Sequence, residues 1–112
     1  ALAAIPDSAG VRNNLGIALA AQNRPADAVA AFRAAVAAEP KSAVAHRNLA
    51  DALSEAGQVD EAIAEFEVAR SLAPDDAPTR YNFGVVLLEA GRLPEAIAEL
   101  RAAVALTPDS VD

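Results

Sequence analysis

Three asparagines recur at one position of a repeating pattern, and their side chains are candidates for binding chemistry. Asn14, Asn48 and Asn82 are each 34 residues apart. An amide side chain donates and accepts hydrogen bonds, which matches the N–H and C=O groups of a peptide backbone. Stacked repeats would place the three amides in a row along one wall, where they predict a site for an extended peptide. The alternative is that each amide bonds to a neighbouring helix.

An apolar stripe lies beside the third asparagine. Tyr81, Val85 and Leu88 have the spacing of a single helix face. The stripe predicts a shallow pocket for an apolar side chain of a partner, with ordinary packing inside a narrow superhelix as the alternative. Other positions expected on the same wall are Asn13, Ile17, Ala20, Ala21, Val44, Ser54 and Glu89.

A charged row surrounds the second asparagine. Arg47, Asp51 and Glu55 lie at positions i, i+4 and i+8 of one predicted helix. Such a row either pairs with a polar ligand or forms a chain of ion pairs within the helix. We include Arg47 and Asp51 among the predicted peptide-binding residues.

Catalytic and metal chemistry has few candidates. The sequence has one histidine, His46, and no cysteine. No serine stands in a nucleophile context, so a catalytic base at position 46 would have no partner. The aspartates at 75, 76 and 109 lack the ligand number and the glycine turn of a calcium loop. We therefore predict no catalytic residue, no metal site and no cofactor, and we expect His46 to be a packing residue.

The composition indicates closely packed helices and excludes several partners. Alanine supplies 31 of the 112 residues, and the net charge is −7. The acidic balance argues against sequence-independent binding to nucleic acid and against an anionic membrane surface. No apolar run reaches the ~18–20 residues of a membrane-spanning helix. No signal peptide is visible. We expect a cytoplasmic protein, with the periplasm as the alternative.

The positions of these residues follow from a repeat. Residues 43–76 align with 9–42 and with 77–110, and a period of this length indicates stacked supersecondary units. The predicted divisions are the end of a preceding repeat at 1–8, repeats at 9–42, 43–76 and 77–110, and a tail or further repeat at 111–112. Each repeat should hold two helices. The first helices are predicted at 10–22, 43–56 and 78–90, and the second helices at 26–39, 60–73 and 94–107.

The helix boundaries are marked by residues with a known preference for helix ends. A proline ends each unit, and a capping residue follows two positions later. Asparagine or glycine separates the two helices of each unit, because both accept the left-handed conformation. These positions are Pro6, Pro40, Pro74 and Pro108; Ser8, Ser42, Asp76 and Ser110; and Asn23, Gly57 and Gly91.

The aligned apolar residues complete a pattern that resembles the tetratricopeptide repeat. The second unit matches at Leu49, Ala50, Leu53, Gly57, Ala62, Phe66, Ala69 and Pro74. The first matches at Leu15, Gly16, Leu19, Asn23, Ala28, Phe32, Ala35 and Pro40, and the third at Phe83, Gly84, Leu87, Gly91, Ala96, Leu100, Ala103 and Pro108. The usual tryptophan is replaced by Arg12, His46 and Arg80.

The resemblance implies an all-α fold, a right-handed solenoid of antiparallel helix pairs whose first helices form a concave wall. It implies a non-enzymatic scaffold that binds a peptide or a protein partner there. The asparagine row is similar to the asparagine ladder in the repeat superhelix of O-linked GlcNAc transferase. The positions of the family's carboxylate clamp hold Asn13, Ile17, Pro78 and Asn82, so its cations are missing and chaperone C-termini are not expected to bind.

Two other functions are compatible with the sequence. Uncapped repeat ends leave apolar side chains in water, so the chain could assemble with further copies of itself. It could also be the non-catalytic arm of a larger enzyme, such as a glycosyltransferase. Alanine-rich, cysteine-free arrays of this kind occur in bacteria.

Overall fold

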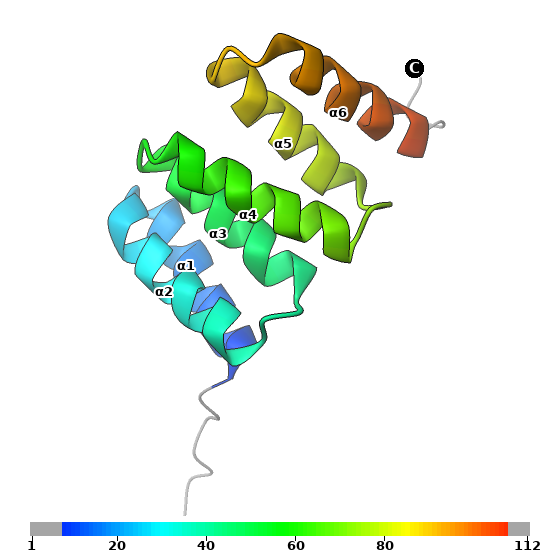
Figure 1. Cartoon of the computed structure of the whole chain (residues 1–112). Coiled ribbons are helices and arrows are strands. Elements are labelled where there is room, and N and C mark those ends of the chain that lie inside the picture. The colour runs from blue at the N-terminus through cyan, green and yellow to red at the C-terminus, as the bar shows by residue number, and fades with distance from the viewer. Residues whose placement is uncertain (1–7, 108–112) are drawn as a thin grey trace, which may run out of the picture.

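Six α-helices and no strand form residues 8–107, the part of the chain that the computed structural model describes. They are α1 (Ala9–Ala21), α2 (Pro25–Ala38), α3 (Ala43–Glu55), α4 (Val59–Leu72), α5 (Ala77–Glu89) and α6 (Leu93–Leu106). Consecutive helices pair as hairpins, and the hairpins follow one another along the molecule (Figure 1). Residues 1–7 of the predicted remnant of a preceding repeat lie outside the described residues, as do Pro108, the cap at Ser110 and the tail at 111–112.

The predicted helix ends are confirmed to within one residue. Ser8, Ser42 and Asp76 each accept a hydrogen bond from the backbone N–H three residues later, as N-caps do. The second helices all begin and end one residue earlier than predicted. At the turns inside the hairpins, Asn23, Gly57 and Gly91 have positive φ angles of 60°, 84° and 78°.

Large apolar side chains from first helices fill the space between hairpins. Leu49 and Phe83 are almost fully buried, and Phe83 stacks on Phe66 of the preceding hairpin with 5.5 Å between ring centroids. Small residues let the two helices of a hairpin approach closely. A Cβ atom added at Gly16 would lie 2.5 Å from the Phe32 ring, which explains the glycine there.

Leu15 departs from the predicted core. It aligns with the buried Leu49 and Phe83, yet 54% of its surface is exposed. The two equivalents are covered by the hairpin before them, and no described residue occupies that place for Leu15. At the other end of the molecule, Val104 on α6 is 71% exposed.

A basic residue at the family's tryptophan position ties each linking turn to the following hairpin. His46 is buried, with Nε2 2.7 Å from the carbonyl oxygen of Pro40 and Nδ1 2.6 Å from Glu65. One repeat later, Arg80 donates to the carbonyl oxygen of Pro74 and to Glu99. His46 is therefore buried as expected, but hydrogen bonds as well as packing hold it.

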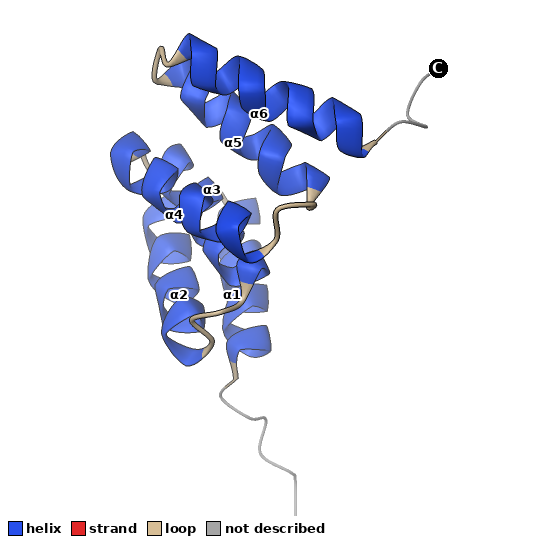
Figure 2. Cartoon of the chain, turned by 45° about the vertical axis from the view of Figure 1, so that its right-hand side comes forward, coloured by secondary structure: helices blue, strands red, loops and turns tan. Residues whose placement is uncertain are grey.

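The first helices form the inner side of the array. Neighbouring first helices approach one another directly, whereas the second helices contact the array only through first helices and long side chains. The α5–α6 hairpin stands further from α3–α4 than α3–α4 stands from α1–α2 (Figures 1 and 2). This wider junction leaves room between α3 and α5 on the inner side.

Candidate functional site

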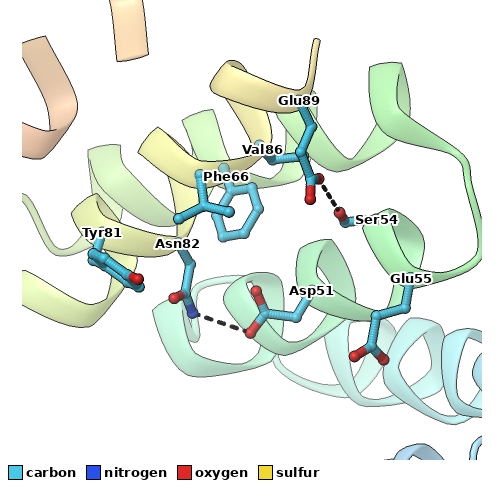
Figure 3. A pocket seen from close by; sticks show the side chains of 9 residues that line it. Asp51, Ser54, Glu55, Phe66, Tyr81, Asn82, Val86 and Glu89 are labelled. Atoms are coloured by element: carbon cyan, nitrogen blue, oxygen red, sulfur yellow. Dashed lines mark hydrogen bonds between the residues drawn. The ribbon is translucent and has the colours of Figure 1, made fainter. Parts of the chain in front are cut away.

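A cavity of about 380 Å³ opens between α3 and α5. Its apolar lining comes from Phe66, Val85 and Val86. Tyr81 stands at one end (Figure 3). The other lining residues are polar or acidic: Asp51, Ser54, Glu55, Asn82 and Glu89. The cavity therefore combines an apolar base with a rim of hydrogen-bonding groups.

Two hydrogen bonds join the cavity walls. The Asn82 Nδ2 group donates to Asp51 Oδ2 over 3.3 Å, and the Ser54 hydroxyl donates to Glu89 Oε1 over 3.4 Å (Figure 3). Both are longer than usual for bonds of their kind, so a ligand with better geometry can replace them at little cost.

Asp51 has the most strongly shifted pKa among the residues that line the cavity. Burial raises the pKa of its carboxyl group to about 6, and the negative charge of Glu55 adds to the rise. Arg47 and the Asn82 amide act in the opposite direction but do not offset the burial. At neutral pH the site thus holds a poorly solvated negative charge.

A second, smaller cavity continues the groove toward the first hairpin. It measures about 180 Å³ and lies between α1 and α3. Its lining residues are Ile17, Ala20, Phe32, Asn48, Asp51, Ala52 and Glu55. Asp51 and Glu55 therefore face both cavities, and the two cavities form one interrupted groove along the first helices.

The structure brings together part of the predicted site. Asn82, Asp51, Tyr81 and Val85 line the larger cavity, and Asn48 lines the smaller one. Asn14 and Leu88 are exposed on α1 and α5 and line neither cavity.

Arg47 was predicted to bind peptide, with a chain of ion pairs within α3 as the alternative, and the structure does not show that chain. Its guanidinium instead reaches the N-cap of α5, where Nη1 lies 3.1 Å from Asp76 Oδ2. The cap carboxylate is fixed beside the first turn of α5, so it offers Arg47 a better-placed partner than the half-buried Asp51. Hydrogen bonds from the Thr79 side chain and backbone, together with Arg47, lower the pKa of Asp76.

Some lining residues were absent from the predicted set. Ser54, Glu55 and Glu89 are expected on the inner wall but are not among the predicted peptide-binding residues, although Glu55 and Glu89 recur 34 residues apart as the asparagines do. That recurrence was the available signal. The sequence pattern predicts Phe66 as a core residue and makes no prediction for Val86, and both line the cavity because the α3–α5 junction is wide.

Family comparison identifies the repeat. Profiles of the tetratricopeptide repeat match residues 13–77 and 55–112. The chain belongs to the tetratricopeptide repeat family. A search of curated protein sequences found no match. Tetratricopeptide repeats are in general interaction modules without catalytic activity.

Solved tetratricopeptide repeat structures share the fold. MamA superimposes with a TM-score of 0.86 at 23% identity, covering 92% of this chain and 60% of MamA. YrrB, described as a TPR protein with an unusual peptide-binding site, superimposes with a TM-score of 0.85 at 24% identity. The match covers 94% of this chain and 54% of YrrB. The first TPR of Spaghetti (RPAP3), bound to the HSP90 peptide SRMEEVD, superimposes with a TM-score of 0.88 at 18% identity. The match covers 98% of this chain and 87% of the Spaghetti chain. This chain thus spans little more than half of MamA or YrrB, and the architecture is an all-α helical repeat solenoid.

None of the helices in residues 8–107 is long and apolar enough to cross a membrane. Within the same range, no group of three or more histidine or acidic side chains is arranged to hold a metal ion.

Proposed function

We propose that this chain is a non-enzymatic scaffold that binds an extended peptide in the groove along α1, α3 and α5. The main support is the pair of adjoining cavities, since Asn48 lines one and Asn82 lines the other. Side-chain amides at this spacing offer donors and acceptors to successive parts of an extended backbone. YrrB and Spaghetti, which share the fold, are described with peptide binding or a bound peptide.

The three asparagines are not equivalent in this proposal. Asn48 and Asn82 are half-buried in the groove, so their bonds to a peptide form away from bulk water. Asn14 is exposed and contributes less. Asn82 must exchange its long bond to Asp51 for a bond to the peptide.

The test is the affinity of a peptide selected from an array for the triple variant Asn14→Ala, Asn48→Ala and Asn82→Ala. We expect a loss of at least about 10-fold by fluorescence anisotropy, because each bond contributes about 0.5–1.5 kcal/mol. The matched control is Gln22→Ala with Gln58→Ala, which removes two exposed amides outside the groove. Equal affinity of the triple variant and the wild type would rule out the asparagine row.

Self-assembly is a second candidate, supported by the exposed apolar side chains on the first and last hairpins of residues 8–107. Phe83 packs on Phe66 of the preceding hairpin, and Leu15 and Leu100 are their counterparts in the outer repeats. A cavity of about 530 Å³ on the α5–α6 hairpin is lined by Tyr81, Leu100, Ala103 and Val104, among others. Leu15 of a second copy would fit this face as Phe83 fits the α3–α4 hairpin.

Such head-to-tail contacts do not close by symmetry, so assembly should grow with concentration. Light scattering over a concentration series should show this growth for the wild type and its loss for Val104→Asp. A monomer at every concentration would contradict self-assembly.

A further inference from the structure

The cavity between α3 and α5 has a one-sided charge distribution. Asp51, Glu55 and Glu89 contribute carboxylates to its lining, and no lysine, arginine or histidine of residues 8–107 lines it. The arginine nearest in sequence to Asp51, Arg47, is directed to Asp76 at the start of α5. Arg47 still lowers the pKa of Asp51, but no described cation lies in the cavity wall beside the three acids.

We infer that this cavity receives a basic side chain of the bound peptide, and that arginine fits it best. The inference rests on the proposed peptide-binding function and specifies the partner: an extended segment with a basic residue facing the α3–α5 junction. The groove is thereby selective in charge, whereas the asparagines would bind any backbone.

The lining matches the two parts of an arginine side chain. Val85, Val86 and the Phe66 ring offer an apolar floor to the aliphatic stem. The guanidinium has five N–H donors and no acceptor, so it suits a rim of carboxylate oxygens. Tyr81 at the cavity end adds an aromatic face on which a guanidinium can stack. A lysine places one compact charge among the same acids and makes fewer simultaneous bonds.

The same acids disfavour other occupants. A peptide such as SRMEEVD, which Spaghetti binds, has more acidic than basic residues and would be repelled by the three carboxylates. An uncharged apolar side chain would cover Asp51 without compensating its charge, and burying an uncompensated charge is costly. A basic side chain can pack its aliphatic stem on the apolar lining and pair its charge with the carboxylates.

The experiment compares two short alanine–serine peptides that differ at one central position. One carries arginine and the other citrulline, which keeps the shape and removes the charge. Binding to the full chain is followed by amide NMR shifts. We expect the arginine peptide to shift the amides of Asp51, Ser54 and Asn82 and to bind at least about 10-fold more tightly than the citrulline peptide, because charge-assisted bonds are the stronger ones.

The variant Asp51→Asn with Glu89→Gln should remove this preference. The matched control, Asp60→Asn with Glu95→Gln, changes the charge equally at positions outside the groove and should keep it. Equal binding of the two peptides in the groove would overturn the inference and leave the proposed function standing. Shifts confined to residues outside the groove, or no shift with either peptide, would overturn both.

Discussion

Replacing Asp51 by asparagine should stabilise the protein at neutral pH. The pKa of Asp51 is about 6 in the folded state, against the ordinary aspartate value of 3.8 that we take for the unfolded chain. The folded state therefore holds the proton more tightly, and the free energy of unfolding falls as the pH rises from the lower value through the higher one. Asparagine keeps the shape and can still accept the Asn82 bond, but it has no charge to bury.

The size of the effect follows from the shift. The pKa of Asp51 differs by about 2 between the folded and unfolded states, and each pKa unit corresponds to about 1.36 kcal/mol. The gain in the free energy of unfolding is therefore at most about 3 kcal/mol. Because Asp51 is half-buried and open to water on the groove side, we expect about 1–2 kcal/mol after solvent screening. The gain should be complete above the folded pKa and absent below the unfolded pKa.

Urea unfolding followed by circular dichroism checks this prediction at about pH 4 and about pH 7.5. Asp75→Asn is the matched control, because Asp75 is exposed in the turn before α5 and lines no described cavity. The reasoning is refuted if Asp51→Asn is no more stable than the wild type at the higher pH, or if its advantage is the same at both values.

Three further changes test the packing and the polar contacts. Phe66→Ala should lower the free energy of unfolding by about 3–5 kcal/mol, since it empties a buried core site and removes the stacking on Phe83, whereas Val68→Ala on the exposed side of α4 should cost under about 0.5 kcal/mol. Glu99→Gln should cost about 2–4 kcal/mol in the same urea assay, because it leaves two arginines without their buried partner, while the exposed Glu95→Gln should change little. Ser42→Ala should cost about 1 kcal/mol by removing the N-cap bond of α3, and restoration by Asp at that position would confirm the capping role. Equal losses for Phe66→Ala and Val68→Ala, or for the two glutamate variants, would contradict the assigned packing.

The helix pattern could be predicted from the sequence because its determinants are local. Ser42 and Gly57 act within a few residues of their own position, so the bounds of α3 follow from the chain around it. The 34-residue recurrence of Leu49 and Phe83 likewise predicts burial between hairpins. The exposure of Leu15 could not be predicted in this way, because its burial depends on a neighbouring hairpin and not on residue type.

The candidate site was harder to predict because it depends on distances between hairpins. Arg47 has a suitable partner four residues away in sequence, yet it pairs with Asp76 of the next hairpin. The cavity between α3 and α5 exists because α5 stands away from α3, and no local sequence pattern encodes that separation. The hydrogen bond between Ser54 and Glu89 could not be predicted from the sequence, because the two residues lie on different hairpins.

The most direct test of peptide binding in the groove is to map an array-selected peptide on the protein by amide NMR shifts. The proposal predicts shifts that concentrate on the inner residues of α3 and α5, with Asn48, Ser54 and Asn82 among the largest. It also predicts that saturation of these shifts gives the same affinity as fluorescence anisotropy. Shifts confined to α2, α4 and α6, with the groove amides unchanged at saturation, would contradict it.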